Sequence, residues 1–321
     1  MNLFDGDFSL LWLRVFQPLL RLLLGMSAGL FLGALLETFK WTDRLAILAM
    51  PLARLAHLKA PCAASFSLAF VSPHAANGIL AENYDSGKIS GRELIVANLF
   101  NSLPAFLVHL PSVFLLLWPV LGFAAFIYAA ISMLAAFFRL FASILIGRFI
   151  LAPPAGSGKK LDEERRSSAP RNPWRKALDR FLNRLPKLIG FTVPFYFLIL
   201  FLGQWGAFEY MERFLADRLY LGDLVNPRTI SIIALQLLAE MGATLGAAAA
   251  LLDTAGVGAD DIVLAMLIGS ALAAPIRAIR HQLPAYAGFF SPRLALRVVA
   301  ANQTLRLASM IIAIGVFVIA R

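Results

Sequence analysis

The chain of 321 residues has a single cysteine, Cys62, and only four histidines. One cysteine excludes an intrachain disulfide framework and a structural zinc site built from several thiolates. The histidines show no metal-ligand spacing, and neither a G-x-S-x-G motif nor an ordered Ser, His and Asp pattern is present. The segment GSGKK at 156–160 lacks the first glycine and the Ser or Thr of a phosphate-binding loop. We therefore expect no enzymatic activity.

Charged residues are also scarce. They make up 15% of the chain, against about 25% in soluble domains, while 60% of the residues are hydrophobic. The formal net charge of +10 does not indicate a nucleic-acid partner, because Lys and Arg lie in loops beside apolar stretches, as in membrane proteins. The composition predicts an integral membrane protein whose main partner is the lipid bilayer.

The apolar stretches occur in two similar sets. Each set contains three stretches suited to crossing a hydrocarbon core about 30 Å thick, and between its first and second stretch lies a weaker segment rich in Ala, Gly and polar residues. The spans are expected at 19–37, 92–118, 121–151, 186–208, 260–280 and 292–320, and the weaker segments at 60–83 and 228–252. The predicted fold is all-α and polytopic, with membrane repeats at 1–151 and 181–321 joined by a basic linker at 152–180.

The charges of the loops predict how the repeats are oriented. Lys and Arg exceed acidic residues in the linker and in 38–59 and 277–297, which is typical of cytoplasmic segments. Segment 253–261 has three aspartates and neither Lys nor Arg, so it is predicted outside. Each repeat then has three spans and one re-entrant hairpin, with inverted topology and both termini outside. The first hairpin enters from the cytoplasmic side, which makes 85–91 cytoplasmic.

The segment SPHAANGILAENYDSG at 72–87 is polar although apolar runs flank it. Non-helical backbone at membrane depth is tolerated only where protein buries it or where it lines a wet cavity. We expect a helix break at Pro73 and Gly78, with Ser72, Asn77 and Asn83 capping helix ends or contacting a ligand. The second hairpin offers Gln236, Glu240 and Thr244.

The spans after the hairpins add further polar residues. Asn98 is three and four residues from Asn101 and Ser102, so one helical face would present all three. Asn and Ser side chains within spans contact a ligand or join helices by hydrogen bonds, and Glu240 contacts the solute or coupling ion or pairs with a buried arginine. The candidate substrate-binding residues are Ser72, Asn77, Asn98, Asn101, Ser102, Gln236, Glu240, Thr244, Ser270 and Arg277.

Two similar blocks of the chain resemble the nucleoside-recognition or Gate domain, one at 65–104 and its second version at 235–275. The second block is followed by IRHQLPAYAGFFSPRLALR at 279–297. Spore maturation proteins A and B, the membrane part of the ferrous iron transporter and the core of concentrative nucleoside transporters share that domain. The resemblance implies paired hairpins near the membrane centre and a bacterial inner-membrane location. It does not identify a substrate.

These features together predict a secondary transporter of a small polar or anionic organic solute. Alternating access would move one hairpin relative to the other around a mid-membrane site, with Na⁺ or protons as candidate coupling ions. The sequence does not identify a cofactor. A homodimer or a paired subunit of the same family is a possible partner. The alternatives are a non-transporting partner subunit of a larger complex and a protein that flips or handles lipid headgroups.

Overall fold

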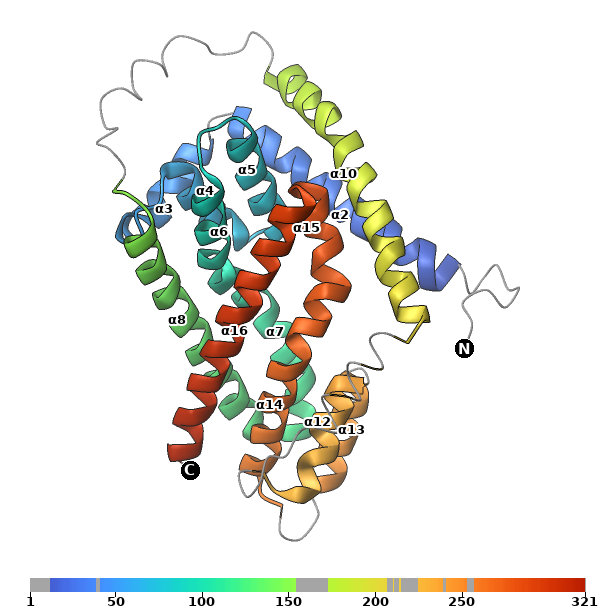
Figure 1. The fold of residues 1–321 in the computed structure, drawn as a ribbon. Helices are drawn as coiled ribbons and strands as arrows, with labels where there is room; N and C mark the ends of the chain where they lie inside the picture. Colours follow the sequence, from blue (N-terminus) through green and yellow to red (C-terminus); the bar gives the residue numbers. More distant parts are fainter. Residues whose placement is uncertain are drawn as a thin grey trace. The chain divides into compact units, whose positions relative to one another are not determined.

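The computed structural model describes residues 12–38, 41–153, 173–206, 210, 214, 225–238, 241–252 and 257–320. The described residues form helices joined by short turns, with no β-strand among them (Figure 1). The predicted all-α class is confirmed. Four stretches are long and apolar enough to cross a membrane, namely Gly91–Leu121, Ala124–Ile150, Ala259–Phe289 and Pro292–Ala320.

These four stretches correspond to four of the six predicted spans. The other two, 19–37 and 186–208, fall largely in helices α2 (Gln17–Thr38) and α10 (Pro173–Gln204), and their crossing of a membrane stays a prediction. Of the predicted linker, residues 154–172 lie outside the described residues, and residues from 173 onward already belong to α10.

The chain forms two compact units, each built from segments far apart in the sequence. Unit 1 comprises Met1–Ala105, Leu140–Phe197 and Leu283–Asn302, and unit 2 comprises Phe106–Arg139, Leu198–Gln282 and Gln303–Arg321. Helices α8 (Ala124–Ile150) and α16 (Pro292–Ala320) therefore each contribute to both units. The two repeats predicted at 1–151 and 181–321, and their inverted relation, stay predictions.

Unit 1 holds the first weak segment and the helices packed around it. Helix α3 packs against α4, and both α2 and α4 pack against α5. Three ion pairs join α10 to α5, from Arg184 to Glu82 at 3.0 Å and to Asp85 at 3.4 Å, and from Lys187 to Asp85 at 3.6 Å. Among the helices of unit 1 are α3 (Trp41–Leu55), α4 (Ala60–Ala69), α5 (Pro73–Asp85), α6 (Gly91–Phe100) and α15 (Leu283–Phe289).

The predicted break at Pro73 is confirmed, and the one at Gly78 is wrong. Residues 70–72 form the turn between α4 and α5, and Pro73 is the first residue of α5, where its missing N–H has no helical partner to lose. Gly78 is buried inside α5, which continues through it without interruption. Glycine permits unusual backbone conformations but does not require them, and the close packing of α5 keeps this one helical.

The second weak segment also forms short helices, η3 (Pro227–Thr229), α12 (Ile230–Leu238) and α13 (Met241–Leu252). Helix α12 packs against α13 and also against α14 (Ala259–Arg277). A π-helical turn, η4 (Ala278–Gln282), follows α14. Whether the α4–α5 and α12–α13 pairs are re-entrant in a membrane stays a prediction.

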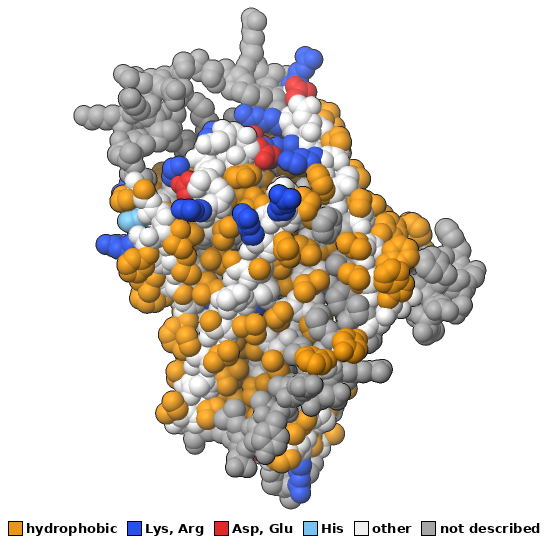
Figure 2. All heavy atoms as spheres, viewed as in Figure 1, with side chains coloured by type: hydrophobic (Ala, Val, Ile, Leu, Met, Phe, Trp, Pro, Cys, Tyr) orange, Lys and Arg blue, Asp and Glu red, His pale blue; other side chains and the backbone are white. Residues whose placement is uncertain are grey.

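The core of unit 2 surrounds α14. Residues 262–267 of this helix are fully buried, and Leu117, Ala125 and Ile232 share the same hydrophobic cluster. Large apolar side chains on the other long helices are exposed instead, such as Phe149 at 84% and Ile319 at 88%. Hydrophobic side chains also cover much of the visible face along α8 (Ala124–Ile150) and α16 (Pro292–Ala320) in Figure 2. Exposed apolar surface of this extent indicates a membrane protein.

Candidate functional site

Asn98 lies at the centre of a buried polar cluster in unit 1. Its Nδ2 donates to Oδ1 of Asn77 at 2.8 Å. Its Oδ1 accepts from the hydroxyl of Tyr286 at 3.2 Å and from Nδ2 of Asn302 at 2.6 Å. We call these four residues the Asn98 cluster. An amide has two donor hydrogens and two acceptor lone pairs, so three of the four hydrogen-bonding positions of Asn98 are used.

Four helices supply the Asn98 cluster, and their local structure holds it in place. Asn77 lies on α5 and Asn98 on α6, while Tyr286 is on α15 and Asn302 on α16. Asn302 also donates to the carbonyl of Val298 one turn earlier, at 3.1 Å, which orients its amide. Three of the four stretches that can cross a membrane therefore each contribute one polar side chain to the cluster.

Asn101 and Ser102 are not part of the Asn98 cluster. A one-residue turn at Asn101, with helical backbone angles, joins α6 to α7 (Ser102–Leu121). The single helical face predicted for Asn98, Asn101 and Ser102 stays a prediction. Nδ2 of Asn101 instead donates to Oγ of Ser65 on α4, at 3.1 Å. The hydroxyl of Ser102 is buried and has no hydrogen-bond partner among the described residues.

Ser72 is the N-cap of α5, which confirms the first of its two predicted roles, capping a helix end. Its side chain accepts from the backbone N–H of Ala75 at 3.2 Å, which satisfies one of the unpaired donors of the first turn. This leaves the hydroxyl hydrogen of Ser72 available for a second bond.

The predicted residues of the second half lie in unit 2. Gln236 on α12 is 3% exposed and packs against Gly269 of α14, whose missing Cβ leaves room for the amide. Neither polar atom of that amide has a hydrogen-bond partner in the part of the chain that is described. The hydroxyl of Thr244 on α13 is likewise buried without a described partner. Glu240 lies outside the described residues.

Ser270 and Arg277 are connected through the backbone of α14. Nη2 of Arg277 donates to the carbonyl of Ser270 at 3.3 Å. The guanidinium of Arg277 is also close enough to that of Arg306 on α16 for the two charges to repel each other. Such a pair of like charges favours an anion nearby.

Sequence reasoning missed Tyr286 and Asn302 as site residues. Asn302 stands inside the long apolar stretch 292–320, and that position is the only local signal that could have identified it. Tyr286 gives no such signal, because an aromatic residue near the end of a span is common. No group of three or more His, Cys, Asp or Glu residues that could hold a metal ion occurs among the described residues.

Comparison with known proteins finds relatives but no family. No family model matches the chain, and no solved structure matches it. Uncharacterized protein MJ0871 of Methanocaldococcus jannaschii is 28% identical over 267 residues, which cover 81% of this chain and 79% of that protein. Uncharacterized protein MJ1556 of the same archaeon is 24% identical over 272 residues, or 83% of each chain. Membership of the nucleoside-recognition family and a bacterial origin both stay predictions.

Proposed function

We propose that this membrane protein is a secondary transporter of a small polar or anionic organic solute, and that the Asn98 cluster is part of its binding site. The observation that carries the proposal is that three potential membrane spans each direct a polar side chain into one buried cluster. Alternating access would expose this site to one side of the membrane at a time.

The composition of the Asn98 cluster suits a polar solute. Hydrogen bonds between helices in a membrane are worth about 0.6 kcal/mol each on average. Single amides could join these helices, yet the cluster gathers three asparagines and a tyrosine in one place. Amide and phenol groups both donate and accept, so they can exchange their mutual bonds for bonds to a hydroxyl, amide or carboxylate of a solute.

The buried amide of Gln236 is a second observation that favours a bound ligand, this time in unit 2. A buried polar group without a partner costs about 1–3 kcal/mol, and both atoms of this amide lack one among the described residues. A bound solute or water would remove that cost. The neighbouring arginines Arg277 and Arg306 favour a solute with negative charge. Coupling to Na⁺ or protons, with Glu240 as the coupling residue, is part of the same proposal.

Thermal-shift screening of the detergent-purified protein tests this function. The panel would contain nucleosides, carboxylates, phosphate esters and lipids, and a solute that binds the folded state raises the melting temperature by an amount that grows with the logarithm of its concentration relative to its Kd. For any solute that stabilises the protein, Asn98→Ala and Glu240→Gln should each make the thermal shift smaller. The apparent affinity calculated from that shift should fall at least tenfold. A transported solute should also enter vesicles that contain the protein.

Asn83→Ala is the matched control for these variants. Asn83 is also a buried asparagine on α5, but its side chain donates only to the carbonyl of Ile79 in its own helix, at 2.8 Å. This variant should lose some stability and keep the full response to the solute. If Asn98→Ala and Glu240→Gln keep that response too, the binding site lies elsewhere and the proposal is wrong.

A further inference from the structure

A wide cleft in unit 1 lies apart from the Asn98 cluster and shares no residue with it. The cleft has a volume of about 920 Å³ and opens to the surface. Four separate parts of the chain form its walls: Lys59, the segment 84–95 including the start of α6, the residues 150–153 at the end of α8, and the start of α16. A cleft of this volume can hold a ligand of several tens of atoms.

Most of the charged side chains that line the cleft are basic. Among the described residues of the lining, Lys59, Arg92, Arg293 and Arg297 supply four positive charges, and Glu93 is the single carboxylate. Lys and Arg side chains gather around the start of α16 in Figure 2. The starts of α6 and α16 add the partial positive charge of helix N-termini to the same cleft. Its electrostatic character is therefore that of an anion site.

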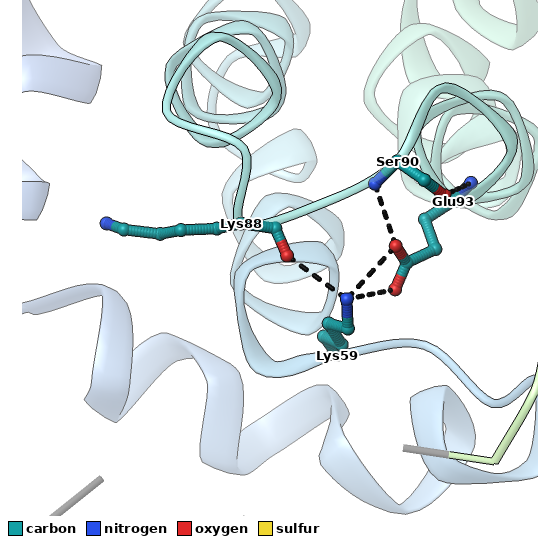
Figure 3. Close-up of polar contacts among 4 residues, drawn as sticks. All are labelled: Lys59, Lys88, Ser90 and Glu93. Carbon is teal, nitrogen blue, oxygen red and sulfur yellow. Dashed lines mark hydrogen bonds and ion pairs between the residues drawn. The ribbon is translucent and has the colours of Figure 1, made fainter. Parts of the chain in front are cut away.

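The one carboxylate of the cleft is already engaged, as Figure 3 shows. Oε1 of Glu93 pairs with Nζ of Lys59 at 3.0 Å, and Oε2 accepts from the backbone N–H of Ser90 at 2.8 Å. The hydroxyl of Ser90 accepts in return from the N–H of Glu93, which completes a capping box at the start of α6. Nζ of Lys59 also donates to the carbonyl of Lys88 at 3.1 Å.

The three arginines of the cleft are not engaged in this way. Arg92, Arg293 and Arg297 are exposed and form no hydrogen bond or salt bridge within the described chain. An arginine presents a planar fork of donors that matches two oxygens of a phosphate. Three unengaged arginines at one cleft can therefore bind a phosphate group from several sides.

The lining of the cleft also contains apolar side chains. Ile95, Ile150 and Leu294 are among them, and Ile150 is 53% exposed. The imidazole Nδ1 of His57 lies 2.9 Å from the carbonyl of Leu151, which ties the end of α8 to the turn before α4. A ligand that combines a phosphate with an apolar part therefore matches the side chains of the lining.

We propose that this cleft binds the phosphate group of an anionic ligand, with the apolar part of that ligand against Ile95, Ile150 and Leu294. The ligand is either an anionic glycerophospholipid or a soluble phosphate ester, and both offer the same group to Arg92, Arg293 and Arg297. The inference does not rest on transport, because it depends on none of the residues of the Asn98 cluster.

Native mass spectrometry and thermal shift on the detergent-purified full chain test the cleft. The probes are phosphatidylglycerol, zwitterionic phosphatidylcholine, inorganic phosphate and glycerol 3-phosphate. The Arg293→Gln/Arg297→Gln double variant should bind the preferred anion about tenfold more weakly, because each basic residue near a phosphate contributes to the attraction. Preference for phosphatidylglycerol identifies a lipid, and stabilisation by glycerol 3-phosphate identifies a soluble ester.

An Arg54→Gln/Arg148→Gln double variant is the matched control. Both arginines are exposed and neither lines the cleft, so the variant removes the same charge elsewhere. It should retain binding within about twofold, and both double variants should keep the melting temperature of the unliganded protein. The proposal is overturned if the two variants weaken binding equally, if the cleft variant binds normally, or if no anionic probe binds better than phosphatidylcholine.

Discussion

At the scale of single residues, the Asn98 cluster is a cooperative unit. Asn302 donates to the same oxygen of Asn98 that accepts from Tyr286, so removing one donor changes the surroundings of the other. Residues within one hydrogen-bond network show non-additive effects on stability. The free energy of unfolding should therefore reveal which partners of Asn98 act together.

A double-mutant cycle of Asn98→Ala and Asn302→Ala measures that interaction. The two substitutions should together destabilise the protein by less than the sum of their separate effects, with an interaction energy of about 0.6 kcal/mol or more. Denaturant unfolding in detergent provides the values, and Asn83→Ala with Asn302→Ala should be additive. Additive effects for Asn98 and Asn302 would show that their 2.6 Å contact contributes nothing.

Lys59 permits a second test at this scale. Its partner Glu93 has a side chain only 10% exposed, so Lys59→Gln leaves a nearly buried carboxylate with one backbone donor and no cation. We expect a loss of about 1 kcal/mol in unfolding free energy, while Arg92→Gln, which removes an exposed charge without a described partner, should be neutral. Equal melting temperatures for the two variants would contradict the role of the pair.

Local residue patterns explain which of these contacts the sequence could predict. Ser72 before Pro73 is a helix-start signal, and the capping role of Ser72 is confirmed. The contacts of Asn98 with Tyr286 and Asn302 join residues 188 and 204 positions apart, and no local pattern determines such pairs. Asn98 and Asn77 were identified as site residues because polar groups are costly in apolar segments, but their mutual bond depends on how α5 packs against α6.

At the scale of elements, the close approach of α8 to its neighbours depends on Gly147. A Cβ at this position would overlap the backbone carbonyl of Ala56 and lie 3.1 Å from Cγ1 of Val96. A backbone atom cannot move aside as a flexible side chain does, so even the smallest side chain would push α8 away. The same displacement would move residues 150–153, which line the cleft, and so change the shape of the cleft.

Gly147→Ala should accordingly lower the unfolding free energy by about 1–3 kcal/mol and weaken binding of an anion in the cleft. Gly315→Ala is the control, because a Cβ at Gly315 of α16 would meet nothing within 4 Å and alanine favours helix. Thermal unfolding of the two variants side by side gives the comparison. An unchanged melting temperature for Gly147→Ala would mean that α8 tolerates the displacement.

Helix type and most helix positions followed from the sequence, because long apolar runs and N-terminal signals are local properties. The turn at Asn101 and the continuity of α5 through Gly78 did not follow. Gly78 suggested a break, yet α5 continues through it. Tertiary packing decides such cases, since it stabilises helical glycine by far more than the roughly 1 kcal/mol that glycine costs.

At the scale of the whole molecule, the cleft bears on the predicted topology. Its walls come from four segments that charge and parity assign independently to the cytoplasmic side, namely 38–59, 85–91, the start of the linker, and 277–297. Segments on opposite faces of a membrane could not meet in one surface cleft. Their proximity supports a common side for all four, and the aspartates of 253–261 are then predicted on the other.

Cysteine labelling in intact cells tests this assignment. Lys88→Cys and Asp260→Cys place a thiol at two exposed positions, and the single native cysteine, Cys62, is buried and can be replaced by alanine as background. A membrane-impermeant maleimide should label position 260 in intact cells and position 88 only after the membrane is opened. Inverted repeats place these two turns on opposite sides because each hairpin enters from a different face. Labelling of both positions under the same condition would show that the two halves run in the same direction, and the alternating-access proposal would lose its structural basis.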